Sequence, residues 1–268
     1  MSRVVVVTGG TRGIGLGLAK AFLNHGCQVV ICGRSNSSVA SALEELSPLG
    51  EAHGIPCDVS EPVQVQALWD AAVERFGRVD VWINNAGVMN SLVDFADATV
   101  DEIGTVVDVN LLGAMYGAHV AFRGMREQEG GGFVYLMEGL GSGGEVRPQH
   151  TVYGATKYAV RYLVKALVEE AKDTEVRIGS ISPGIVVTDL LMDVYKTRPV
   201  EEIVRAKKVF NILADHVDTV APWIAERVLV AKDNGTAITW LTKFSAFSRF
   251  ATAAFNKRDL FAEAEAEA

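Results

Sequence analysis

Tyr153 and Lys157 stand four residues apart in a stretch, residues 152–172, whose apolar side chains recur at helical spacing. Residues four apart share one face of a helix, so the ammonium group is expected beside the phenol. A free tyrosine has a pKa of about 10, and a neighbouring ammonium lowers that pKa because it stabilises the phenolate. The pair therefore predicts a tyrosine that exchanges protons near neutral pH, as a general acid or base does.

A glycine-rich turn follows the first run of β-branched residues and opens a stretch of helical period. Glycines let the backbone approach a pyrophosphate closely, and the free N–H groups at a helix start attract its negative charge. This context predicts a dinucleotide site rather than an ordinary turn. The residues expected to bind the dinucleotide here are Gly9, Thr11, Arg12, Gly13, Ile14 and Gly15.

The end of the second predicted strand indicates which dinucleotide is bound. A site that prefers NAD places an acid there, whereas this chain has Gly33, Arg34 and Ser35. Arg34 and Ser35 offer a guanidinium and a hydroxyl to a 2′-phosphate, and Arg12 adds a second cation. We expect NADPH as the cofactor, with NAD or dual use as the alternative. The nicotinamide would give a hydride to a carbonyl carbon while Tyr153 protonates the oxyanion, and its oxidised, positive form would lower the tyrosine pKa further.

Alternating strands and helices must position these residues. Short runs of β-branched residues alternate with longer amphipathic stretches, which is the pattern of βαβ units in a parallel sheet. We expect an α/β fold, a single-domain Rossmann-type doubly wound parallel sheet of about seven strands. The strands are expected near residues 3–8, 28–32, 51–56, 80–83, 132–137, 176–181 and 236–240. The helices are expected near residues 14–25, 37–46, 62–76, 99–127 and 152–172.

The sequence contains no stretch rich in Pro, Ser or Gly that would link two domains, so residues 1–240 are expected to form one NADP-binding domain. Within it, a partly amphipathic stretch at about 189–220 interrupts the alternation and predicts a substrate lid. Residues 241–268 are expected to form a C-terminal helical arm with five phenylalanines among basic residues, followed by Ala-Glu repeats. One interpretation packs this arm on the body or on a neighbouring subunit. The other places it against a membrane surface or a lipophilic substrate.

Composition also excludes several classes of protein. The 268 residues hold 25 basic and 33 acidic side chains, and a net charge of −8 argues against a nucleic-acid partner. No apolar run approaches the length that spans a bilayer, and the start of the chain leaves no room for a targeting segment, so we expect a cytoplasmic protein. Cys27, Cys32 and Cys57 suggest neither a disulfide framework nor a zinc site. No metal is expected, because the five histidines show no metal spacing.

Four motifs occur together in one order: the glycine turn, Asn84-Asn85-Ala86-Gly87, Asn110, and the Tyr153 and Lys157 pair. With them the chain, from about residue 3 to 240, resembles the short-chain dehydrogenase/reductase family. The resemblance implies that Lys157 also holds the nicotinamide ribose, that Asn110 organises a water beside the lysine, and that the enzyme forms a homo-oligomer, a dimer or tetramer. It implies further cofactor contacts at Asp58, Val59, Asn85, Ala86, Gly87, Pro183, Gly184, Val186 and Thr188. Asp58 has an equally weighted alternative as the N-cap of the following helix.

One family residue is missing. The family usually has a serine thirteen residues before the tyrosine, and this chain has Leu140 there. Ser142, in a glycine-rich loop, is our expected substitute as a catalytic hydrogen-bond donor to the substrate oxygen. The alternatives are that Glu138 acts as a second acid, or that Ser142 is only structural.

The run Met137-Glu-Gly-Leu-Gly-Ser-Gly-Gly144 before the tyrosine is more specific, and with it the chain resembles the chlorophyll(ide) b reductases. This resemblance implies NADPH-dependent reduction of the formyl group of chlorophyll b or chlorophyllide b to a hydroxymethyl group. The alternatives are a general reductase of 3-oxoacyl, steroid or sugar carbonyls, and a non-catalytic NADP-binding regulatory protein.

Overall fold

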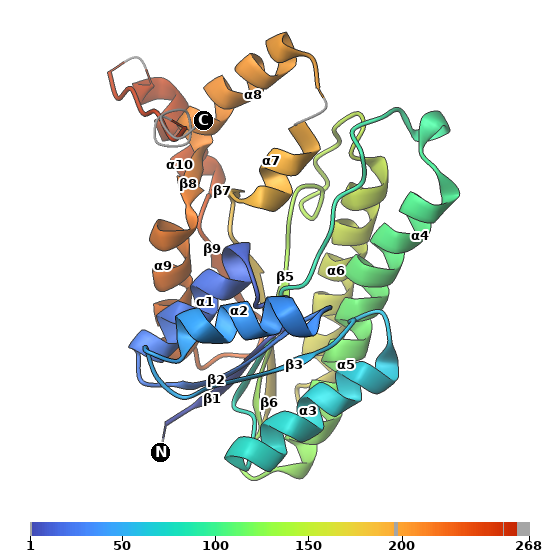
Figure 1. Ribbon diagram of the computed structural model, residues 1–268, viewed down its shortest axis with the longest axis vertical. Coiled ribbons are helices and arrows are strands. Elements are labelled where there is room, and N and C mark those ends of the chain that lie inside the picture. The colour runs from blue at the N-terminus through green and yellow to red at the C-terminus, as the bar shows by residue number, and fades with distance from the viewer. Residues whose placement is uncertain (1, 196–197, 254, 262–268) are drawn as a thin grey trace.

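A seven-stranded parallel sheet forms the centre of the molecule (Figure 1). The computed structural model describes residues 2–195, 198–253 and 255–261. The sheet order is β3-β2-β1-β4-β5-β6-β9, and every neighbouring pair is parallel. All seven expected strands are present, so the doubly wound α/β fold is confirmed. The strands are β1 Val4–Val7, β2 Gln28–Gly33, β3 Ala52–Pro56, β4 Val81–Asn84, β5 Gly132–Met137, β6 Val176–Ser182 and β9 Thr236–Thr239.

The central strands are rich in buried apolar residues because helices cover both faces of the sheet. Along β1, Val5 and Val7 belong to one buried cluster and Val6 to the other. The first cluster includes side chains of α1 Gly13–Asn24, α2 Asn36–Leu46 and α9 Val217–Val230. The second includes side chains of α3 Pro62–Phe76, α5 Gly113–Glu127 and α6 Thr151–Glu170.

The helix expected over residues 99–127 is divided into three parts. α4 Val100–Val107 begins with a capping box between Thr99 and Glu102. A π-helical turn, Asp108–Leu112, follows and leads directly into α5. Such a turn inserts a residue into the helical ladder and changes the direction of a side chain, in this case Asn110, which is 1% exposed.

The segment between β6 and α9 contains two helices and a small sheet that the sequence did not predict. β7 Ile185–Val187 pairs in parallel with β8 Ala214–His216, and α7 Asp189–Tyr195 and α8 Val200–Leu213 lie between them in the chain. Tyr195 packs edge-on against Phe210 with ring centroids 5.5 Å apart. Residues 196–197 of the expected lid lie outside the described residues.

The C-terminal segment packs against this small sheet through one carboxylate. Buried Asp215 accepts hydrogen bonds from Trp240 Nε1 at 2.7 Å, Arg249 Nη1 at 2.7 Å and Arg258 Nη2 at 2.6 Å. Burial alone would raise the pKa of Asp215, but these three bonds outweigh it and lower the pKa. α10 Lys243–Thr252 is thereby fixed beside α8.

The aromatic residues of this segment divide into two groups. Phe261 is buried against Phe210, whereas four phenylalanines are at least half exposed. These four are Phe244, Phe247, Phe250 and Phe255. The Ala-Glu repeats at residues 262–268 lie outside the described part of the chain.

Three further observations concern membrane-spanning helices, disulfide bonds and metal sites in the described part of the chain. Within residues 2–195, 198–253 and 255–261, no helix has both the length and the apolar character needed to cross a membrane. All three cysteines are buried free thiols. Among the same residues, no three His, Cys, Asp or Glu side chains cluster closely enough to hold a metal ion.

Candidate active site

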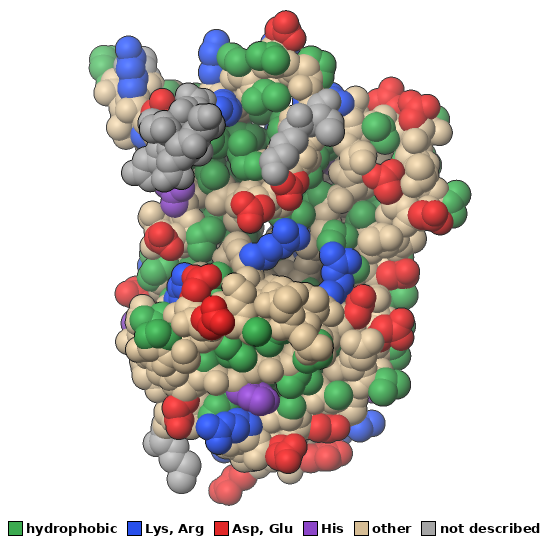
Figure 2. All heavy atoms as spheres, in the orientation of Figure 1, with side chains coloured by type: hydrophobic (Ala, Val, Ile, Leu, Met, Phe, Trp, Pro, Cys, Tyr) green, Lys and Arg blue, Asp and Glu red, His purple; other side chains and the backbone are tan. Residues whose placement is uncertain are grey.

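A cavity of about 360 Å³ opens at the carboxyl ends of the parallel strands, where ligands bind in doubly wound sheets. Figure 2 shows Lys and Arg side chains on either side of a hollow in the middle of this face. Every residue expected to bind the cofactor lines the cavity except Ser35. Of the four expected catalytic residues, Tyr153 and Lys157 line it, whereas Asn110 and Ser142 are not among the described residues that do.

The glycine turn has the close contacts that require glycine. Gly9 has a φ of +63°, and a Cβ atom on it would lie 2.9 Å from the Cα of Ala86. A Cβ atom on Gly15 would lie 2.3 Å from the carbonyl oxygen of Gly9. These positions exclude side chains, so the turn leaves its backbone open to the cavity as a pyrophosphate site requires.

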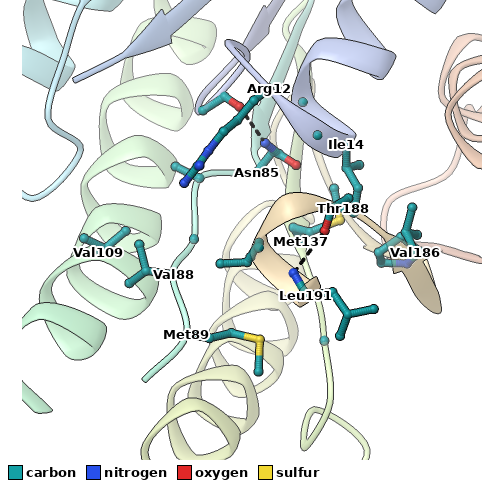
Figure 3. Close-up of a pocket in the computed structure, with 18 of the residues that line it drawn as sticks. Arg12, Ile14, Asn85, Val88, Met89, Val109, Met137, Val186, Thr188 and Leu191 are labelled. Carbon is teal, nitrogen blue, oxygen red and sulfur yellow. Dashed lines mark hydrogen bonds between the residues drawn. The ribbon is translucent and has the colours of Figure 1, made fainter. Parts of the chain in front are cut away.

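Thr8 and Asn85 hold this turn against the end of β4. The Thr8 hydroxyl accepts hydrogen bonds from the backbone N–H groups of Asn85 and Ala86 at 3.0 and 3.1 Å. Asn85 Nδ2 donates to the carbonyl oxygens of Thr8 at 2.8 Å and Gly9 at 3.3 Å. The Asn84-Asn85-Ala86-Gly87 motif thus supports the turn from a neighbouring strand (Figure 3).

Two exposed arginines, Arg12 and Arg34, line one part of the cavity. Figure 3 shows the Arg12 side chain extending away from the start of α1. Ser35 does not join them: its hydroxyl caps α2 by accepting the Ser38 N–H at 3.1 Å. The Ser35 hydroxyl therefore has a helix-capping role, because the start of α2 needs an acceptor, and its role as a phosphate ligand stays a prediction.

Asp58 and Val59 line the cavity after β3. Asp58 Oδ1 accepts from the backbone N–H of Ser60 at 3.0 Å and from its hydroxyl at 2.6 Å. The alternative that Asp58 caps the next helix is wrong, because Glu61 occupies the N-cap position of α3.

Tyr153 and Lys157 lie side by side on the first turns of α6. Lys157 Nζ lies 5.7 Å from the centroid of the Tyr153 ring and donates to the carbonyl oxygen of Met137 at 3.1 Å. Burial lowers the pKa of Lys157 to about 8, although the carboxylate of Glu138 opposes the change. Burial raises the pKa of Tyr153 to about 12. The direction is opposite to the lowering expected from the sequence, because removal of the phenol from water disfavours the phenolate.

The side-chain amide of Asn110 is held by hydrogen bonds to the backbone of Val88. Its Oδ1 accepts from the backbone N–H of Val88 at 2.8 Å, and its Nδ2 donates to the Val88 carbonyl at 2.9 Å. A Cβ atom on Gly87 would lie 3.2 Å from Asn110 Oδ1 and 3.8 Å from Lys157 Nζ. The π-helical turn therefore brings Asn110 to the chain segment that passes beside Lys157.

Ser142 does not stand where a substrate oxygen could reach it. Its side chain is 3% exposed, accepts from the Gly139 N–H at 3.0 Å and donates to the Lys157 carbonyl at 3.1 Å. These two bonds fold the glycine-rich loop back onto α6 and use the hydroxyl both as donor and as acceptor, which favours the structural alternative over the catalytic assignment of Ser142.

Glu138 follows β5 directly and lines the cavity. Its Oε2 lies 3.7 Å from Nη1 of Arg161, which stands one helical turn beyond Lys157. Glu138 thus interacts with two cations of α6, Lys157 and Arg161.

The remaining wall is mostly apolar. Pro183, Gly184, Val186 and Thr188 line it as expected. The Thr188 hydroxyl accepts from the Leu191 N–H at 3.4 Å, which joins this loop to α7 (Figure 3). Several other lining residues were given no site role from the sequence, namely Met89, Arg147, His150 and Phe210, and Leu140 was noted only in the place of the family's serine. The spacing of His150, three residues before Tyr153, is the signal that could have found it.

Comparisons with known proteins agree with this geometry. Residues 3–199 match the family model described as short chain dehydrogenase. The chain is 39% identical over 269 residues to the rice (Oryza sativa subsp. japonica) protein named chlorophyll(ide) b reductase NOL, chloroplastic, covering 95% of this chain and 76% of that one.

A second rice protein, named "Probable chlorophyll(ide) b reductase NYC1, chloroplastic", is 36% identical over 261 residues, or 90% of this chain. The chain spans about half the length of that relative. The crystal structure of levodione reductase superimposes with a TM-score of 0.77 at 27% identity, covering 91% of this chain and 98% of the other.

Proposed function

This chain belongs to the short-chain dehydrogenase/reductase family, and we propose that it uses NADPH to reduce a carbonyl group to an alcohol. The observation that supports the proposal best is the meeting of three parts in one cavity: the open glycine turn, the arginines of the 2′-phosphate side, and the Tyr153 and Lys157 pair. Family membership makes the chain an oxidoreductase acting on carbonyl or CH–OH groups, and the finer assignments below are our proposals.

The residues present fit a phosphorylated dinucleotide. The turn that Gly9 and Gly15 keep free of side chains would receive the pyrophosphate, and Arg12 and Arg34 would pair with a 2′-phosphate. No acid lies beside Arg34 in the sequence to repel that phosphate. Thr188 and Val186 would hold the nicotinamide end against the substrate side of the cavity. When bound, the reduced nicotinamide supplies the hydride.

Tyr153 supplies the proton. Because its pKa is raised to about 12, the hydroxyl stays protonated across the physiological range and is ready to donate as the carbonyl oxygen gains negative charge. The phenolate left behind is stabilised by the Lys157 ammonium beside it. Asn110 acts as a positioning residue, since its amide fixes the Val88 backbone next to the lysine.

The proposed substrate is the formyl group of chlorophyll b or chlorophyllide b, which becomes a 7-hydroxymethyl group. Two kinds of support exist: similarity to proteins with that name, and a largely apolar substrate wall that includes Leu140, Leu191 and Phe210. Apolar walls with a few polar groups are typical of sites for small molecules and cofactors.

We also propose that the chain forms a homo-oligomer through α4 and α6. Val100 is 82% exposed, and Tyr158 and Tyr162 are 60% and 73% exposed on the helix that bears the catalytic pair. Sedimentation of the purified protein tests this proposal, and a single monomeric species would contradict it.

The exposed phenylalanines of α10 are proposed as a peripheral contact with a membrane, from which a lipophilic pigment would be taken. Basic residues flank them in the sequence, and aromatic and basic side chains together are typical of segments that bind lipid surfaces.

The decisive experiment is an anaerobic incubation of purified protein with NADPH and chlorophyllide b, in which the NADPH absorbance and the pigment spectrum are followed together. We expect a 7-hydroxymethyl product, and Tyr153→Phe should lower the rate by roughly 10²–10⁴-fold while NADPH still binds. Turnover of small carbonyl compounds without any pigment reduction would support the carbonyl reductase activity but exclude the pigment as the substrate. NADPH binding without turnover of any carbonyl would favour a regulatory protein.

A further inference from the structure

His150 lines the cavity that holds Tyr153, and it is 9% exposed. It stands at the N-cap of α6, three residues before the tyrosine, and its carbonyl oxygen accepts the Gly154 N–H at 2.7 Å. The backbone of His150 is therefore fixed by the same helix that positions the general acid. Neither the hydride transfer nor the proton transfer described above uses this side chain.

The imidazole has a defined tautomer. Nδ1 lies 3.0 Å from the carbonyl oxygen of Pro148, which can only accept, so Nδ1 carries the hydrogen. Burial lowers the pKa of His150 and so favours the neutral ring, although this hydrogen bond opposes the change. The lone pair therefore resides on Nε2, to which no hydrogen bond is made by a described residue. A carbonyl group bound at Nδ1–H is the usual means of orienting a histidine whose Nε2 binds a metal.

The backbone before His150 is strained. Gln149 has a φ of +65°, and it is the one non-glycine residue with a positive φ among those described. Its carbonyl oxygen accepts from Asn90 Nδ2 at 3.4 Å, and its Oε1 accepts from Arg198 Nη2 at 3.0 Å. Such strain persists where surrounding contacts enforce it, and it is concentrated at ligand sites.

From these three observations we infer that His150 Nε2 is the axial ligand of the magnesium ion at the centre of a chlorophyll-type substrate; this inference rests on the proposed function. The tetrapyrrole itself supplies four nitrogen ligands, so one protein ligand is enough and no cluster of metal-binding side chains is needed. A single histidine binds the iron of haem in the same manner.

The spacing of the two side chains suits this substrate. The formyl group lies at the rim of the macrocycle and the metal at its centre, so the two are separated by about one ring radius. On a helix, the Cβ atoms of residues three apart lie about 5–6 Å apart. With the shorter imidazole under the metal, the longer Tyr153 side chain would reach the rim and protonate the formyl oxygen. The ligand would thus fix the centre of the ring at a set distance from the tyrosine.

The test compares chlorophyllide b with its magnesium-free derivative, prepared by acid. For both pigments the binding constant is measured from the absorption change on titration, and kcat/KM is measured with NADPH. The wild-type protein should bind the magnesium pigment at least about tenfold more tightly, which corresponds to about 1.4 kcal/mol. Binding should also shift the pigment absorption bands, because the metal gains a ligand.

His150→Phe should reduce this preference to about one while reduction of the magnesium-free pigment continues, which would show that the site is still folded. Exposed His25, at the end of α1, provides the matched control, and His25→Phe should keep the full preference. External imidazole should restore part of the preference in His150→Ala. Equal binding of the two pigments by the wild-type protein, or an unchanged preference in His150→Phe, would overturn the inference. If neither pigment is reduced, the proposed function fails, whereas the binding titration still decides whether His150 ligates the metal.

Discussion

Replacement of Ser142 by alanine separates a structural serine from a catalytic one. The hydroxyl makes two buried hydrogen bonds, from the Gly139 N–H and to the Lys157 carbonyl. A buried donor left without a partner costs about 1–3 kcal/mol, and the carbonyl loses less because it lies within a helix. We expect Ser142→Ala to lower the free energy of unfolding by about 2–3 kcal/mol. For a protein of this size the midpoint of thermal unfolding should fall by roughly 5–10 °C.

The assay combines thermal or urea unfolding with steady-state reduction of a carbonyl substrate at a temperature where the variant is folded. Because Ser142 lies outside the cavity lining, kcat should fall far less than the roughly 10²–10⁴-fold expected for loss of a general acid. Exposed Ser248 on α10 is the matched control, and Ser248→Ala should change stability by less than about 0.5 kcal/mol. A Ser142→Ala protein with wild-type stability and a rate as low as that of Tyr153→Phe would show that our reasoning is wrong.

Three further predictions concern pH, cofactor choice and the C-terminal segment. The rate of reduction should decline as pH rises through about 8, where buried Lys157 loses the charge that stabilises the phenolate, and a pH–rate profile that stays level to pH 10 would contradict this. Arg34→Asp should weaken NADPH binding by at least about tenfold and improve NADH binding in a fluorescence titration, since a guanidinium–phosphate pair contributes about 1.5–3 kcal/mol. By contrast, Ser35→Ala should cost about 1 kcal/mol of stability as a lost helix cap and leave the cofactor preference unchanged. Phe244→Ser with Phe247→Ser should abolish flotation with anionic lipid vesicles without changing the reduction of a water-soluble carbonyl, and flotation equal to that of the wild-type protein would exclude the proposed contact.

The parts of the site that depend on local spacing could be predicted from the sequence. The i, i+4 spacing of Tyr153 and Lys157 places both on one helix face wherever the helix packs. The glycine turn is equally local, because a positive φ at Gly9 and the contact of Gly15 with the Gly9 carbonyl both arise within a few residues. These features follow from covalent geometry and need no knowledge of distant contacts.

Features that depend on contacts with residues far away in the sequence could not be predicted from the sequence. The hydroxyl of Ser142 could face a substrate or fold back on its own loop, and the choice depends on where the Lys157 carbonyl lies. The pairing of β7 with β8 joins residues about thirty positions apart, and three-residue strands have too short a pattern to be recognised. The raised pKa of Tyr153 likewise reflects the depth of burial, which no spacing reveals.

Asp215 has a practical consequence for anyone who redesigns this chain. A shortened version that stops at the end of β9 would keep the carboxylate and remove the three donors described for it, namely Trp240 and the two cations Arg249 and Arg258. An uncompensated buried charge costs about 3–5 kcal/mol, a large part of the total stability of an ordinary protein. A version made for crystallisation or for fusion to another protein should therefore extend through Phe261, or should replace Asp215 with a neutral residue in the same step.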